Sequence, residues 1–177
     1  HGDFAAFGNG NSGRGVISLV LAKDVDEVSR QLGRPARGIV DIACRCVCQR
    51  PLVVKTSPRL DDGTPFPTLY YLTQPAATAA ISTLEASGFM AELQLEMANS
   101  QELQAAYLAA HKSYLAERDQ LEVVEELDNF SAGGMPERVK CLHALVAHSL
   151  AKGPGVNPMG DTALEALDWS PKACQCS

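Results

Sequence analysis

A change of hydrophobic pattern at Pro75 constrains the fold of this chain more than any other feature. Before it, the ranges 38–44, 51–56 and 68–73 are rich in β-branched and aromatic residues and are bounded by turn residues. Such closely spaced runs predict strands in an antiparallel meander. After Pro75, apolar residues recur with helical spacing. The sequence therefore predicts an α+β fold, with a small antiparallel three-stranded sheet early in the chain, packed by about five helices.

The ends of several elements follow from capping residues. Asp24 is expected to cap a helix over about 24–32, and Ser100 a long helix that reaches Leu121. Pro136 is expected to begin a helix after a Gly-Gly loop, and Asp161 to cap the last helix. A further short strand is expected over 16–22. The domain boundaries predicted from composition are a disordered tail over 1–15, a single α+β domain over 16–170 and a flexible C-terminal tail over 171–177.

Charge is distributed unevenly along the 177 residues. Residues 1–75 hold nine Lys or Arg and seven Asp or Glu, whereas residues 76–177 hold six and fourteen. The net charge of −6 disfavours general nucleic-acid binding, which needs a dominant basic surface. No apolar run approaches the roughly 20 residues of a membrane-spanning helix. A small anionic ligand held by the basic first half is compatible with this distribution.

The cysteines are the main candidates for chemistry. We predict a metal site because thiolate and imidazole are ligands of Zn²⁺, with iron as the alternative ion. In this hypothesis, ligands from the early hairpin and from the penultimate helix meet around one cation. Buried structural thiols, or a disulfide or redox pair, are the alternatives. A second Cys-x-Cys, formed by Cys174 and Cys176, lies in the predicted tail. The candidate ligands are Cys44, Cys46, Cys48, Cys141 and His143.

A second candidate site is a pocket for an anion. Gly133 and Gly134 precede the helix expected at Pro136, and the free N–H groups at a helix start attract anions. The candidate anion-binding residues are Arg59, Arg138 and Lys140. The alternative is that the glycines only permit a turn.

Several long motifs resemble one family. They are the ranges 31–38, 44–51, 58–73, 138–144 and 157–160. Together they resemble the uncharacterised, mainly actinobacterial family number five hundred and one among the domains of unknown function. In the resembled family, His-Arg-Cys-Pro-Cys usually stands where this chain has Cys44 to Cys48, and a cysteine often stands at Gln74. The resemblance implies a cytoplasmic protein, and neighbouring genes such as exopolyphosphatase associate the family with phosphate metabolism or cell division.

Three functions follow as hypotheses. The first is a cytosolic binding or regulatory protein with a structural or regulatory Cys/His metal site. The second is a metal-assisted enzyme, or a binding protein, for a phosphorylated small molecule. The third is a thiol redox protein. The sequence contains no nucleophile–base pair or paired acids at a recognisable spacing, so it assigns no catalytic residues, and it does not predict the oligomeric state.

Overall fold

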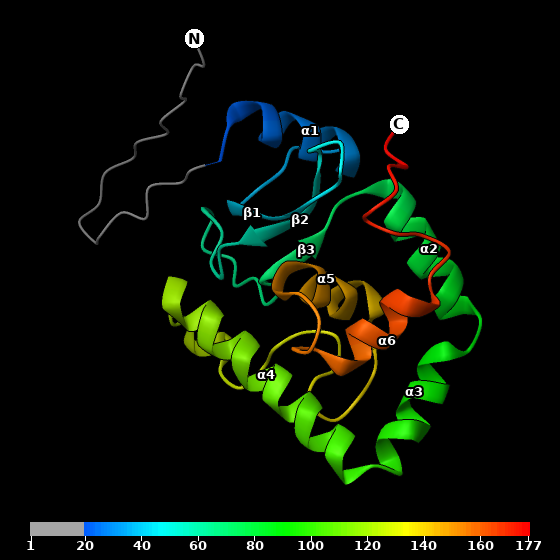
Figure 1. Cartoon of the computed structure of the whole chain (residues 1–177). Coiled ribbons are helices and arrows are strands. Elements are labelled where there is room, and N and C mark those ends of the chain that lie inside the picture. Colours follow the sequence, from blue (N-terminus) through cyan, green and yellow to red (C-terminus); the bar gives the residue numbers. More distant parts are fainter. Residues whose placement is uncertain (1–19) are drawn as a thin grey trace.

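The computed structural model describes residues 20–177 and has the predicted α+β architecture (Figure 1). An antiparallel sheet forms early in the chain, and the described part contains six α-helices, where about five were expected, and one 3-10 helix, η1. In chain order the elements are α1 (Ala22–Leu32), β1 (Ile39–Arg45), β2 (Pro51–Thr56), β3 (Tyr70–Leu72), α2 (Pro75–Ala86), α3 (Phe89–Ala98), α4 (Gln101–Leu121), η1 (Glu125–Leu127), α5 (Leu142–Lys152) and α6 (Pro158–Ala166). The predicted tail over 1–15 lies outside the described residues.

The three strands form a meander in the order β1-β2-β3. Val53 pairs with Cys44 on one side and with Leu72 on the other, whereas Val54 pairs with Tyr71. Because side chains alternate along a strand, these two sets face opposite sides of the sheet. The sheet therefore has two apolar faces, and each must be covered.

Helices α1 and α5 cover the two faces (Figure 1). Helix α5 packs against all three strands, and its Leu142, Leu145 and Val146 are fully buried. Val28 of α1 is also fully buried on the Val54 side. Helices α2 and α6 pack on α5, and α4 packs on α3 and α6. Helix α5 is thus the central element of the hydrophobic core.

Two predicted helix starts are wrong by a few residues. Helix α1 begins at Ala22, and the Asp24 carboxylate accepts two hydrogen bonds from Arg45 of β1, at 2.9 and 2.7 Å, instead of capping. The strand expected over 16–22 is not found in its described part: residues 20 and 21 are in no strand, and Ala22 begins α1. Residues 16–19 lie outside the described part of the chain. Helix α6 begins at Pro158, where the Asn157 side chain accepts a hydrogen bond from the Gly160 N–H at 3.0 Å. Asp161 lies inside the first turn.

The helix expected at Pro136 begins instead at Leu142. The intervening loop closes on itself, because the Gly133 carbonyl accepts a hydrogen bond from the Lys140 N–H at 2.8 Å. Gly133 and Gly134 have φ values of +67° and +92°, and the peptide bond before Pro136 is cis. Helical spacing of apolar residues after a proline cannot reveal such a loop, since its closure depends on backbone angles that glycine alone adopts readily.

Polar groups occupy the centre of the core. His148 of α5 is fully buried, with its ring stacked on Tyr70 at 5.9 Å between centroids and edge-on to Tyr114 at 5.1 Å. Its Nδ1 lies 3.1 Å from the Asn157 side-chain nitrogen, so Nδ1 accepts and the ring proton is on Nε2. Burial in this environment lowers the pKa of His148 to about 4.

Candidate metal centre

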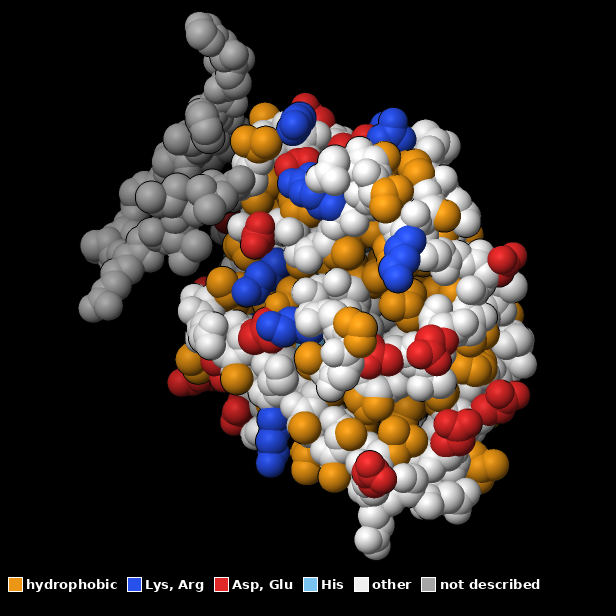
Figure 2. Space-filling model, in the orientation of Figure 1, with side chains coloured by type: hydrophobic (Ala, Val, Ile, Leu, Met, Phe, Trp, Pro, Cys, Tyr) orange, Lys and Arg blue, Asp and Glu red, His pale blue; other side chains and the backbone are white. Residues whose placement is uncertain are grey.

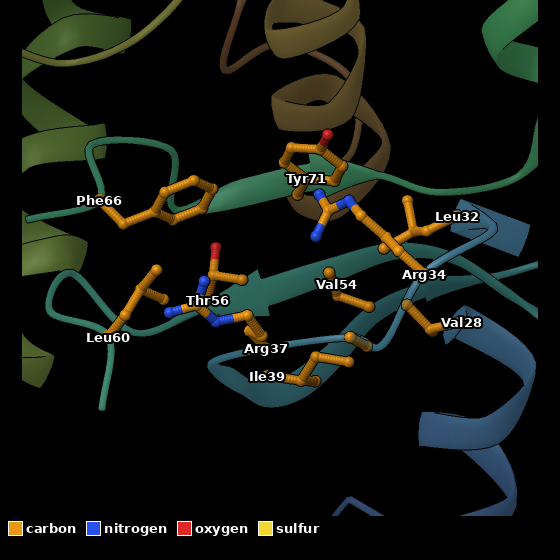
Figure 3. A pocket seen from close by; sticks show the side chains of 11 residues that line it. Val28, Leu32, Arg34, Arg37, Ile39, Val54, Thr56, Leu60, Phe66 and Tyr71 are labelled. Carbon is orange, nitrogen blue, oxygen red and sulfur yellow. The ribbon is translucent and has the colours of Figure 1, made fainter. Parts of the chain in front are cut away.

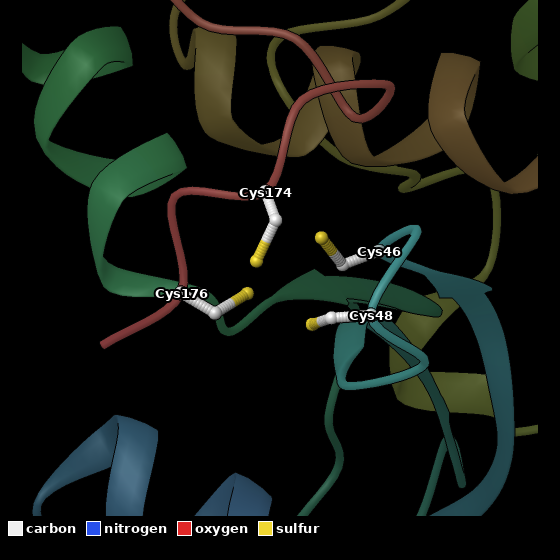
Figure 4. A group of neighbouring side chains, drawn as sticks. All are labelled: Cys46, Cys48, Cys174 and Cys176. Atoms are coloured by element: carbon white, nitrogen blue, oxygen red, sulfur yellow. The ribbon is translucent and has the colours of Figure 1, made fainter.

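Four cysteines from two distant segments converge at one place. The Sγ atoms of Cys46, Cys48, Cys174 and Cys176 all lie within 4.8 Å of one another, and Figure 4 shows the four thiols pointing toward a common centre. We call these residues the four-cysteine cluster. Two of them come from the turn between β1 and β2, and two come from the segment after α6. All six cysteines of the chain are free thiols.

The β1–β2 turn directs the first pair. Cys46 follows the last residue of β1, and its carbonyl accepts a hydrogen bond from the Gln49 N–H at 2.8 Å, which closes the turn. Gln49 has a positive φ of 73°. Two cysteines in a Cys-x-Cys along an extended strand would lie about 6.7 Å apart. The turn brings the Cys46 and Cys48 thiols together, with Cys46 buried and Cys48 exposed.

The C-terminal segment is held beside this turn by contacts of its own. Trp169 is buried in the core. The Gln74 side chain donates to the Gln175 carbonyl at 3.3 Å and contacts the Cys176 Sγ at 3.7 Å. Arg50 donates to the Ser177 carbonyl at 3.0 Å. The segment predicted to be a flexible tail therefore follows a buried tryptophan and has defined contacts at Gln175, Cys176 and Ser177.

The thiols of the cluster differ in their tendency to ionise. The Arg50 N–H donates to the exposed Cys48 thiol and, with lesser contributions from the neighbouring thiols, lowers its pKa to about 7. Burial raises the pKa of Cys46, and burial together with hydrogen bonding to the neighbouring thiols raises the pKa of Cys176 to about 12. Close thiolates repel one another, and a bound cation would offset this repulsion.

A second group of possible ligands lies at the start of α5. The side-chain donors of Glu85, Cys141 and His143 lie within 4.8 Å of one another. Cys141 is the residue before α5, and its thiol forms a hydrogen bond with His143. This hydrogen bond lowers the pKa of Cys141. The same contact raises the pKa of His143.

The structure distributes the five predicted ligands over three places. Cys46 and Cys48 join Cys174 and Cys176, whereas Cys141 and His143 join Glu85 of α2. Cys44 belongs to neither group, because it is still within β1 and packs against the core. The hairpin thiols and the helix thiol therefore do not surround one point. Repetition of the Cys-x-Cys spacing at the C-terminus was the signal for the missing pair, and no sequence signal distinguished Glu85.

One comparison with known proteins gives a match. The family model described as Protein of unknown function (DUF501) matches residues 42–165, which is more than half of the chain. The chain belongs to the DUF501 family. No curated protein and no solved structure matches it. The matched range of this DUF501 protein contains Cys46 and Cys48 and ends before Cys174 and Cys176.

The predicted anion-binding residues of the DUF501 protein do not share a described contact. Arg59 donates to Glu126 at 2.9 Å and lies 3.4 Å from Glu122. Arg138 and Lys140 are exposed in the loop before α5. Since α5 starts later than expected, its first N–H groups face other partners: Leu142 donates to Glu85 at 2.8 Å, and Ala144 donates to Cys141.

A pocket of about 230 Å³ lies between α1 and the sheet (Figure 3). Its floor is formed by apolar side chains that include Val28, Val54 and Tyr71. Arg34 and Arg37 also line it, and Figure 3 shows the Arg34 side chain extending toward Tyr71. Arg37 forms an ion pair with Asp62 at 2.5 Å. Within residues 20–177, no carboxylate pairs with Arg34.

One face of the molecule is mixed in chemical character. On the face drawn in Figure 2, basic side chains are scattered among hydrophobic and acidic ones. Among the described helices, none has the length and apolar character needed to cross a membrane.

Proposed function

We propose that this DUF501 protein contains a structural Zn²⁺ site, in which the four-cysteine cluster fastens the C-terminal segment to the β1–β2 turn. The observation that carries the proposal is the convergence of four thiols, from positions more than 120 residues apart in sequence, within 4.8 Å. Iron in the same four-thiolate geometry is the alternative ion.

The geometry of the cluster supports a tetrahedral ion. Zn²⁺ binds thiolates at about 2.3 Å, so the sulfurs around it lie about 3.8 Å apart. Thiols already within 4.8 Å of one another reach this arrangement by small side-chain rotations. Four protein ligands complete the coordination shell, which is typical of structural rather than catalytic zinc. The proposed ion therefore stabilises the protein and does not act on a substrate.

The proposal also concerns the cellular setting. Free thiols persist in reducing compartments, where closely spaced cysteines bind metals more often than they form disulfides. We therefore propose a cytoplasmic protein, in agreement with the resemblance of its motifs. The ion adds to the Gln74 and Arg50 contacts of the C-terminal segment, and its loss releases both thiols of that segment, which makes the site a regulatory element.

Metal analysis of protein purified without a metal-affinity column tests the site. We expect Cys174→Ser/Cys176→Ser to lose one equivalent of zinc relative to the unaltered chain. Cys44→Ser is the matched control, since Cys44 lies nearby in sequence but outside the cluster, and we expect it to keep its zinc. Zinc content that does not change in the double variant would refute the proposal.

Differential alkylation separates this function from thiol redox activity. In the zinc hypothesis, the four thiols of the cluster resist alkylation in the reduced protein, and a chelator exposes them without any oxidant. If instead they resist alkylation only after oxidation, and a reductant exposes them, the cluster is a redox pair or pairs and the structural-zinc proposal fails.

A second candidate function, binding of a small anion, rests on Arg34. A cation beside an apolar pocket attracts a ligand that has an anionic group and an apolar body. The pocket volume of about 230 Å³ limits this ligand to a small molecule. We expect phenyl phosphate to raise the unfolding temperature of the unaltered protein and not that of Arg34→Gln. Arg30→Gln, which changes an exposed arginine of α1, is the control, and an equal shift in all three proteins would contradict the assignment.

A further inference from the structure

We infer that Glu85, Cys141 and His143 form a second metal site, for a divalent transition-metal ion with one coordination position open to water. These residues belong to α2 and to the start of α5, and none of them is part of the four-cysteine cluster. The inference goes beyond the proposed function, because it concerns a different ion in a different environment.

The donor separations fit a tetrahedral ion. His143 Nδ1 lies 3.3 Å from Glu85 Oε1. A nitrogen and a carboxylate oxygen bound to Zn²⁺ at about 2.0–2.2 Å are separated by about 3.3–3.5 Å in tetrahedral geometry. All three donor atoms, including Cys141 Sγ, lie within 4.8 Å of one another. An ion can therefore be accommodated between them with little movement of the backbone.

The other ring nitrogen of His143 is oriented as in known metal sites. His143 Nε2 lies 3.2 Å from the Thr78 carbonyl and 3.2 Å from Ser82 Oγ. Because a carbonyl only accepts, Nε2 carries a proton, and a neutral ring then presents the lone pair of Nδ1 to the ion. A metal-bound histidine usually donates its other N–H to a backbone carbonyl in this way.

The carboxylate is fixed as well. Glu85 Oε1 accepts a hydrogen bond from the Leu142 N–H at 2.8 Å, at the first turn of α5. The carboxylate therefore lies at the N-terminal end of this helix, where the helix dipole is positive. Cys141 precedes the same turn. Two ligands of the site are thus arranged by the start of one helix, which the sequence pattern placed at Pro136.

This site differs from the four-cysteine cluster in coordination and in access. Three protein ligands leave a fourth position, and the His143 and Glu85 side chains are 27% and 24% exposed, so water can occupy that position. Sites with three protein ligands and a water are typical of catalytic zinc, where the ion lowers the pKa of the bound water toward about 7. The site would therefore supply Lewis-acid activation of water or of a substrate oxygen.

Titration of the metal-free, reduced 177-residue chain with Co²⁺ and Zn²⁺ tests the second site. We expect two equivalents to bind the unaltered chain and one to bind His143→Gln. Glu85→Gln is a second variant, in which the amide oxygen can still accept the hydrogen bond from the Leu142 N–H. We expect this variant to bind the second equivalent of metal at least tenfold more weakly than the unaltered chain. Ser82→Ala is the matched control, because it removes a neighbour of His143 that is not a ligand, and it should bind both equivalents.

The Co²⁺ spectra distinguish this inference from the proposed function. Cys46→Ser/Cys176→Ser should retain one Co²⁺ with the weaker thiolate charge-transfer absorption of a single-sulfur site. His143→Gln should retain the stronger absorption of a four-sulfur site. If the unaltered chain binds one ion, and Cys46→Ser/Cys176→Ser binds none, the second site is refuted and Cys141 and His143 form only a hydrogen-bonded thiol–imidazole pair. If His143→Gln loses the only ion, the proposed four-cysteine site is refuted instead.

Discussion

Arg118 gives a quantitative test of how the core is held together. This arginine of α4 is 2% exposed, and its guanidinium donates to three carbonyl oxygens, of Phe130 at 2.6 Å, Leu127 at 2.8 Å and Pro67 at 3.1 Å. No carboxylate in the described part of the chain forms a salt bridge with it. Arg118 therefore connects α4 to η1 and to the loops that contain Pro67 and Phe130, through hydrogen bonds alone.

Replacing Arg118 by methionine keeps much of the apolar volume and removes all three hydrogen bonds. The Leu127 hydrogen bond is buried and the Pro67 and Phe130 hydrogen bonds are partly buried. A carbonyl that loses its partner costs about 1–3 kcal/mol when buried, and removal of a buried cation offsets part of the sum. We expect Arg118→Met to lower the free energy of unfolding by about 3–5 kcal/mol. Arg118→Lys should have an intermediate effect, because one ammonium cannot reach all three carbonyls in the planar geometry of a guanidinium.

Urea unfolding followed by the fluorescence of the single tryptophan, Trp169, measures this change. Arg30→Met is the control, since Arg30 forms an exposed pair with Glu27, and exposed pairs contribute little to stability. A loss of less than about 1 kcal/mol in Arg118→Met would refute the reasoning, and would mean that water satisfies the three carbonyls without the arginine.

Two further predictions concern the interior. His148 is neutral in the folded protein, because its pKa falls from 6.5 to about 4 on folding, so the unfolded chain takes up the proton first as the pH falls. The free energy of unfolding therefore decreases as the pH falls from about 6.5 to about 4. Between pH 7 and pH 5 we expect this decrease to be about 2 kcal/mol. Urea unfolding of the metal-free protein should show a smaller decline in His148→Phe, and an unchanged decline would argue against a neutral buried histidine. In Gly160→Ala, the added Cβ would lie 2.1 Å from the Leu145 carbonyl oxygen and 2.3 Å from Ser149 Oγ, so α6 must move away from α5. We expect Gly160→Ala to lose more than about 3 kcal/mol of the free energy of unfolding in urea, or to fail to fold. Thr162→Ala, on the exposed side of α6, is the control and should have little effect. Equal stability of the two variants would contradict the close packing.

The local pattern of the sequence was sufficient for most of the sheet and for several helices. Strand β2 coincides with the run over 51–56, and α4 begins after Ser100, whose side chain accepts a hydrogen bond from the Leu103 N–H at 3.1 Å. Helix α2 begins at Pro75, where a proline at the first helical position is favourable. These features depend on residues a few positions apart, which a single sequence shows directly.

The candidate site depended on distant contacts that local pattern does not contain. The spacing of Cys46 and Cys48 predicted them as ligands, and the structure places them beside Cys174 and Cys176 rather than beside Cys141. The choice depends on where the chain after α6 runs, which is determined by the burial of Trp169 and by the contacts of Gln74. The resemblance implies a cysteine at the position of Gln74, and Gln74 contacts Cys176, so this departure from the pattern lies beside the cluster.

The central position of α5 has a consequence for synthesis of the chain. The strands are complete by Leu72, yet the helix that covers Val53 and Leu72 begins only at Leu142. A ribosome must therefore add about 80 more residues before the apolar side of the nascent sheet is shielded, which takes roughly 4–16 seconds at about 5–20 residues per second. During that interval the apolar face of the β-meander is exposed and can associate with other chains. We expect molecular chaperones to bind the nascent chain at this stage.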